Sequence, residues 1–191
     1  MTLAPARDGP GGWGWVTRVL HWGLAGLILF QLGLGLRSAG FTPDLAERFA
    51  LTQTHKSWGA LILVLVLARI GWRLAAPGRP PLPGPAWQAR AARASHAGLY
   101  ALMLALPLSG WVAVSAAPIQ DLLGIRNMAF GLVPLPDPWI PGDARVGKAA
   151  EAVHLWAAIG LAALVGLHVA AALRHHFVLR DGVLRGMIVG R

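Results

Sequence analysis

The feature that most constrains this chain is an uncharged run near its C-terminal end. Residues 152–173 carry no formal charge over 22 positions. An α-helix of that length, rising about 1.5 Å per residue, can cross the roughly 30 Å hydrocarbon core of a bilayer. Two histidines interrupt the run, His154 and His168. A helix would separate them by about 21 Å along its axis and about 40° around it, so we expect one near each membrane surface on a common face.

The overall composition supports a membrane protein with several spans. Hydrophobic residues make up 55% of the chain and charged residues only 13%, which differs from an ordinary soluble domain. The net charge of +9 does not indicate nucleic-acid binding, because the basic residues flank apolar runs and form no patch. The chain has no cysteine, which excludes disulfides, iron–sulfur clusters and thiolate metal sites.

Three further apolar runs complete the predicted architecture. We expect an all-α, integral membrane, four-helix transmembrane bundle in a single domain over residues 1–191, with helices at about 15–36, 53–75, 94–117 and 152–173. The segment 118–148 is predicted to be a long connection. Four spans place both termini on one side of the membrane. That side holds eleven of the seventeen Lys and Arg residues, so the positive-inside rule predicts cytoplasmic termini.

Four histidines then fall into two pairs at two depths. His21 and His168 are expected near the cytoplasmic surface, and His55 and His154 near the outer one. A single histidine in a membrane helix is often a structural group satisfied by a neighbouring helix, but four at matched depths favour axial ligation of two haems. Each of the four has Ala or Gly four residues later, which leaves room for a flat macrocycle, whereas His96 has Tyr100 there. Zinc or copper transport fits poorly, because the spans lack carboxylates, cysteines and methionine clusters.

Several ordered motifs resemble the bacterial cytochrome b561 family over about residues 15–187. They are H-W near the start, T-H-K-S-W-G and R-I-G-W-R-L-A-A-P in the second helix, H-A-G-L-Y and A-L-P-L-S-G-W in the third, A-F-G-L before the long loop, and G-L-H-V-A-A-A-L-R-H-H-F-V-L-R-D in the fourth. The resemblance implies four transmembrane helices, two b-type haems and electron exchange with the quinone pool. It assigns one haem iron to His21 with His168 and the other to His55 with His154.

Within that family the chain looks most similar to the superoxide:quinone oxidoreductase (superoxide oxidase) branch. We therefore expect an enzyme of the bacterial inner membrane that transfers electrons between superoxide and ubiquinone. Two other functions stay open. One is a b-type membrane-anchor subunit that exchanges electrons with a partner redox protein, which would dock on residues 118–148. The other is a structural or transport protein without haem.

Three basic residues beside the predicted sites have two interpretations each. Arg69 and Arg73 would pair the cytoplasmic-side haem propionates, or they are charges that set the topology. Lys56, adjacent to His55, would attract an anion such as superoxide or pair an outer propionate, or it is a lysine that extends to the membrane surface.

The other three histidines are also left open. His96 is either a contact to a propionate or a quinone, or a structural histidine. His175 and His176 follow the last apolar run. They are either interfacial surface residues or part of a quinone pocket.

Overall fold

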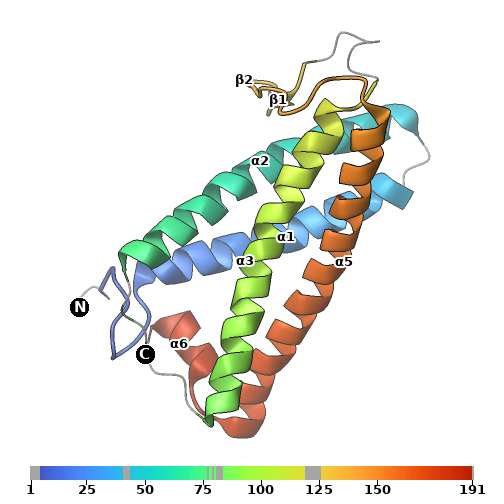
Figure 1. Ribbon diagram of the computed structural model, residues 1–191. Helices are drawn as coiled ribbons and strands as arrows, with labels where there is room; N and C mark the ends of the chain where they lie inside the picture. The colour runs from blue at the N-terminus through green and yellow to red at the C-terminus, as the bar shows by residue number, and fades with distance from the viewer. Residues whose placement is uncertain are drawn as a thin grey trace.

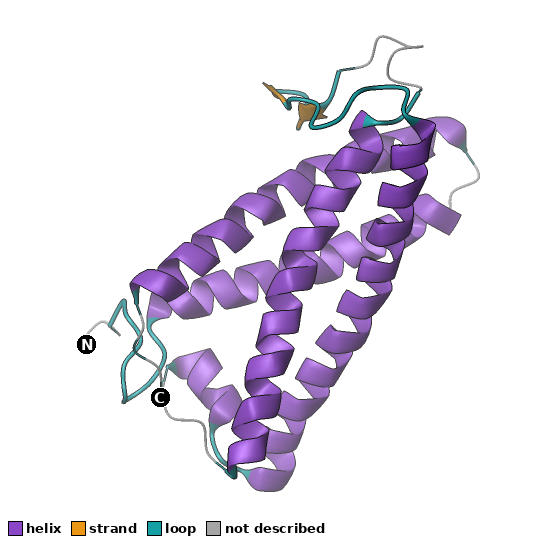
Figure 2. Cartoon of the chain, in the orientation of Figure 1, coloured by secondary structure: helices purple, strands orange, loops and turns teal. Residues whose placement is uncertain are grey.

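The computed structural model describes residues 5–40, 44–76, 78, 80, 84–118 and 126–190. Four long helices make up most of this part of the chain: α1 (Trp15–Gly40), α2 (Leu45–Ala75), α3 (Ala86–Ser115) and α5 (Ala144–Arg174). They pack as two antiparallel pairs, α1 with α2 and α3 with α5, and the two pairs cross each other (Figures 1 and 2). The two chain termini lie toward one end of the bundle, and the small β-hairpin lies at the other end (Figure 1).

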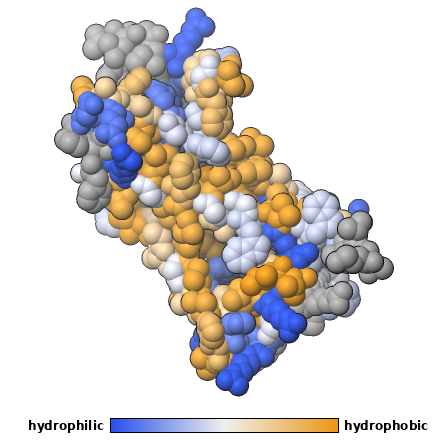
Figure 3. Space-filling model, turned by 180° about the vertical axis from the view of Figure 1, so that it is seen from behind, coloured by the Kyte–Doolittle hydropathy of each residue, from blue (hydrophilic) through white to orange (hydrophobic). Residues whose placement is uncertain are grey.

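Each of these four helices is long and apolar enough to cross a membrane. Few of their side chains are buried within the protein, because most of the apolar surface points outward, where lipid would cover it. Hydrophobic residues accordingly cover much of the face seen in Figure 3, and hydrophilic ones gather toward its two ends. The predicted all-α transmembrane bundle is confirmed.

The helices extend beyond the runs that predicted them. Helix α2 begins at Leu45, eight residues before the predicted start, because the Asp44 carboxylate accepts a hydrogen bond from the Ala46 N–H and caps the first turn. Helix α5 begins at Ala144 because Asp143 caps it in the same way through the Val146 N–H. Hydrogen bonds from the Trp139 indole and the Val146 backbone lower the pKa of Asp143. The eight residues before each of these predicted spans, 45–52 and 144–151, are therefore helical.

The long connection between α3 and α5 contains a small antiparallel hairpin. Strands β1 (Met128–Ala129) and β2 (Val133–Pro134) pair across a turn that holds Phe130 and Gly131 at positive φ. The hairpin is attached to α2, since the Phe130 N–H donates to Ser57 Oγ at 2.8 Å. The described part of the predicted long connection, residues 126–143, therefore includes a hairpin that is bound to α2.

Past α5 the chain turns back toward α1. A π-helical turn, η1 (His175–Leu179), is followed by residues with positive φ and by the short helix α6 (Val183–Val189). Arg18 and Trp22 of α1 donate side-chain hydrogen bonds to the backbone carbonyls of Ile188 and Met187, at 2.8 and 2.9 Å. The C-terminal segment thereby links α5 to the start of α1.

The buried core lies halfway along the bundle. It is formed by one cluster of six apolar side chains: Leu24, Ile28, Ile62, Val66, Met103 and Leu161. Leu161 lies seven residues from His154 and seven from His168. The core therefore forms an apolar layer with one pair of histidines on each side of it.

Candidate functional site

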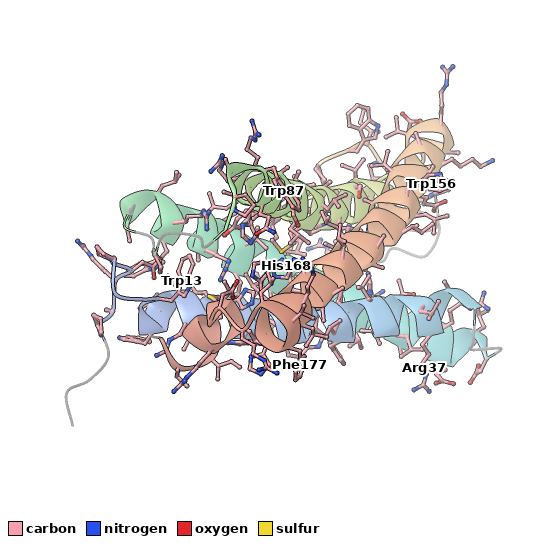
Figure 4. The ribbon with its side chains drawn as sticks, turned by 90° about the horizontal axis from the view of Figure 1, so that it is seen from below. Trp13, Arg37, Trp87, Trp156, His168 and Phe177 are labelled. Carbon is pink, nitrogen blue, oxygen red and sulfur yellow. The ribbon has the colours of Figure 1, made fainter. Side chains whose placement is uncertain are left out.

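The first histidine pair lies at the end of the bundle that holds the termini, and is named the inner pair after the predicted orientation. His21 of α1 and His168 of α5 have ring centroids 6.2 Å apart and planes inclined at 62°. Both side chains are half-buried. In Figure 4 the labelled His168 lies in the middle of the bundle, between α5 and the other long helices.

The second pair lies at the hairpin end of the bundle, and is named the outer pair after the same predicted orientation. His55 of α2 and His154 of α5 have ring centroids 6.0 Å apart and planes inclined at 73°. The fold thus brings together the two pairs that the sequence predicted, one on each side of the apolar core.

Both spacings match the geometry of two imidazoles on one metal ion. Two metal–nitrogen bonds of about 2 Å, with each nitrogen about 1 Å from its ring centre, separate two axial rings by about 6 Å. At 1.5 Å per residue, the fourteen residues between His154 and His168 separate the two pairs by about 21 Å along α5. The residues present therefore fit two bis-histidine haems, one at each depth.

Glycines make room for both rings of the outer pair. A Cβ atom at Gly110 of α3 would lie 3.0 Å from Cε1 and Nδ1 of His154. A Cβ atom at Gly35 of α1 would lie 3.1 Å from Cε1 of His55. Each ring therefore packs on a backbone surface that any side chain at the glycine would occupy.

The orientation of His154 leaves one defined nitrogen for a metal. Its Nδ1 donates a hydrogen bond of 2.9 Å to the backbone carbonyl of Leu106, which also accepts from the Ser109 hydroxyl. A proton on Nδ1 leaves the lone pair of Nε2 free, and such a backbone partner is usual for metal-binding histidines. The Nδ1 atom of His55, in contrast, is buried and has no hydrogen-bond partner among the described residues.

A polar cluster surrounds the inner pair. The Arg69 guanidinium donates to the Tyr100 hydroxyl at 3.0 Å, to the Thr17 carbonyl at 3.2 Å and to His21 Nδ1 at 3.4 Å. Arg73 lies with its Cζ atom 5.8 Å from the Tyr100 ring centroid, within the range of a cation–π contact. Arg69 therefore contacts an inner histidine directly, whereas Arg73 contacts the tyrosine that Arg69 also binds.

The outer pair has a single adjacent lysine, and that lysine already has a partner. Lys56 is half-buried, and its Nζ donates a 2.6 Å hydrogen bond to Oδ1 of Asn127. Asn127 is 2% exposed, and its amide nitrogen donates to the Asp137 carboxylate. The positive charge next to His55 is therefore linked through one amide to a negative charge.

The other histidines occupy different settings. The ring centroid of His96 lies 5.5 Å from that of His168, so His96 belongs to the inner group. His175 pairs with Asp181, whose other carboxylate oxygen accepts from the Val183 N–H at the start of α6, so the pair links η1 to α6. His176 is exposed and stacks edge-on against Phe177, which agrees with the interfacial interpretation.

Several residues of the site were not found from the sequence. They are Gln31, Gly35, Ser109, Gly110 and Asn127. Gln31 carries a usable signal, because an amide within an apolar run needs a partner. The glycines carry none, since the bundle is rich in small residues and only the rotation of each helix decides which of them meets a histidine.

Comparison with known proteins gives one family match and two similar relatives. The family model for prokaryotic cytochrome b561 matches residues 12–190, which include all four long helices. Cytochrome b561 homolog 2 of Escherichia coli (strain K12) is 30% identical over 182 residues, covering 94% of this chain and 92% of the relative. A Yersinia pestis protein named probable superoxide oxidase CybB is 31% identical over 170 residues, covering 88% and 91%.

Proposed function

Because the chain belongs to the prokaryotic cytochrome b561 family, we propose that it is a dihaem cytochrome that transfers electrons between superoxide and the ubiquinone pool. Family membership and the four spans make it a bacterial multi-pass membrane cytochrome of the b type. The finer assignment, to superoxide and ubiquinone, is supported by the similarity to the probable superoxide oxidase.

One observation carries the proposal: two histidine pairs with the same 6 Å spacing lie on opposite sides of one apolar core. His21 with His168 would hold one haem iron, and His55 with His154 the other. Bound haem b supplies one-electron transfer, with a potential set by its axial ligands and the surrounding charges. The protein supplies the ligand nitrogens, and the apolar layer excludes water between the two sites.

Arg69 would change partner when the inner site is filled. A guanidinium only donates hydrogen bonds, so His21 Nδ1 is the acceptor in the present contact. Ligation of a metal through Nε2 requires the proton of the neutral ring to be on Nδ1, which then no longer accepts from Arg69. Arg69 would turn to a haem propionate, for which Arg73 is the second candidate partner.

At the outer end, Lys56 would attract the superoxide anion toward the pair formed by His55 and His154. Local positive potential raises the rate at which a small anion is captured. Asp137 opposes this attraction, because it lies at the far end of the hydrogen-bonded chain that begins at the lysine. Substitutions of Lys56 and of Asp137 should therefore change the rate of reduction by superoxide in opposite directions.

Lys56→Glu should slow the reduction of oxidised protein by superoxide, on the order of tenfold at low salt, whereas Asp137→Asn should accelerate it. Each change alters the charge beside the outer pair without removing a proposed ligand. Stopped-flow absorbance after mixing with superoxide measures the rate. The wild-type rate should fall as ionic strength rises.

The matched control is Arg185→Glu, which alters a charge in α6 at the opposite end of the bundle and should leave the rate unchanged. Slow reduction that is insensitive to salt and to both outer substitutions would reject superoxide as the donor. The remaining function would be a quinone-linked electron carrier supplied by a partner redox protein.

Both termini should be cytoplasmic. Nine described arginines lie on the side of the termini, while Arg79 and Arg191 lie outside the described residues. The nine are Arg7, Arg18, Arg69, Arg73, Arg90, Arg93, Arg174, Arg180 and Arg185. A reporter that is active only in the cytoplasm should therefore be active when it is fused after the last residue. Activity of a reporter that works only in the periplasm, fused at that position, would contradict this orientation. His21 with His168 would then be the pair nearer the periplasm.

A further inference from the structure

Gln31 is an amide within the apolar part of α1. Residues 19–36 carry no formal charge, and Gln31 lies between Phe30 and Leu32. An amide in an apolar environment costs free energy unless it is hydrogen-bonded. The Gln31 Nε2 atom donates a 2.6 Å hydrogen bond to the backbone carbonyl of His55. The side chain thus contacts the very turn of α2 that carries one of the proposed outer ligands.

The surrounding glycines allow this contact. Gly59 lies one turn after His55, and a Cβ atom there would be 3.3 Å from Gln31 Nε2. Gly35 lies one turn after Gln31 and packs against the His55 ring. Two successive turns of α1 therefore contact His55, one at its carbonyl and one at its imidazole.

Two polar atoms at this contact have no partner. Among the buried side-chain atoms of the described residues, Gln31 Oε1 and His55 Nδ1 both lack a hydrogen bond. They are complementary, since an amide oxygen accepts and an imidazole Nδ1–H donates. The corresponding nitrogen of His154 has such a partner in the Leu106 carbonyl. His55 is therefore the outer histidine whose second nitrogen still requires an acceptor.

We propose that Gln31 is the positioning residue of His55: its Nε2 holds the backbone carbonyl, and rotation of the ring brings the Nδ1–H to Oε1, two atoms that are not hydrogen-bonded to each other in this structure. The proposal rests on the proposed ligation by His55. Accepting that proton fixes the tautomer with Nε2 free and makes the imidazole a stronger donor to a metal. A stronger donor stabilises the oxidised metal, so Gln31 lowers the potential of the outer site.

The test is Gln31→Met, which keeps the length of the side chain and removes both amide atoms. The control is Leu29→Met, two residues away on the same helix, where the side chain is 60% exposed. Redox titration and electron paramagnetic resonance are recorded in the full-length protein and in the His168→Ala background, which isolates the outer site. Gln31→Met should raise one midpoint potential and change the resonance signal of the same component. Leu29→Met should change neither.

Gln31→Glu serves as the conservative variant, because it retains an oxygen that can accept the Nδ1 proton. Unchanged potentials and signals in Gln31→Met would overturn the proposal. Equal loss of one haem in the Met and Glu variants would also overturn it, since that result indicates a packing role only. Loss of one haem in Gln31→Met, with both haems retained in Gln31→Glu, would support the proposal. Failure of the ligand assignment itself is seen separately, as a wild-type protein without two haems.

Discussion

His154→Ala should yield a protein with one haem per chain in place of two. The substitution removes one of the two imidazoles whose centroids lie 6.0 Å apart at the hairpin end. It also leaves the Leu106 carbonyl without its His154 donor. The inner pair lies about 21 Å away along α5 and beyond the apolar core, so its haem should remain. The pyridine haemochrome assay, normalised to protein concentration, measures the ratio.

His168→Ala should give the complementary result, with the outer haem retained and the inner one lost. His96→Ala is the critical control, because the His96 ring lies 5.5 Å from His168 and is the competing partner for it. That variant should keep two haems, as should His176→Ala, which alters an exposed side chain. One haem in the wild type would reject the pairing. Loss of a whole haem in His96→Ala would show that His96, and not His21, is the ligand opposite His168.

The spans and the two histidine pairs could be predicted from the sequence because each depends on a single helix or on depth alone. An uncharged run indicates a helix in contact with lipid, and the position of a histidine within the run indicates its depth in the membrane. The pairing of His154 with His55 follows from depth once four spans are assumed. It needs no knowledge of how the helices are rotated.

The helix ends and the supporting contacts could not be predicted in this way. Hydropathy reports where a helix meets lipid, whereas Asp44 and Asp143 extend two helices into polar segments. The contact of Gln31 with the His55 carbonyl depends on the rotation of α1 against α2. Asn127 is far in sequence from Lys56, and the β-hairpin beside it brings the two together.

Gly110→Val should remove the same haem as His154→Ala, although residue 110 is not a ligand. A Cβ atom at this position would lie 3.0 Å from two atoms of the His154 ring, which is tighter than most real Cβ contacts. The His154 ring has few other positions to take, because its Nδ1 donates to the Leu106 carbonyl and the ring faces His55. The Cβ atom and the two methyl groups of valine should therefore displace the ring from these partners, at an overpacking cost of about 1–3 kcal/mol.

Gly110→Ala should reduce the content of the outer haem less than Gly110→Val does, because alanine adds only the Cβ atom and not the two further methyl groups of valine. Gly166→Val on α5 is the matched control, since a Cβ atom there meets nothing within 4 Å. Haem content and the ratio of the two redox components measure the outcome, and retention of the inner haem in Gly110→Val reports that the bundle has folded. If Gly110→Val kept two haems with wild-type potentials, the His154 ring could not lie against α3 when haem is bound. The Leu106 carbonyl would then not be the group that fixes the His154 tautomer.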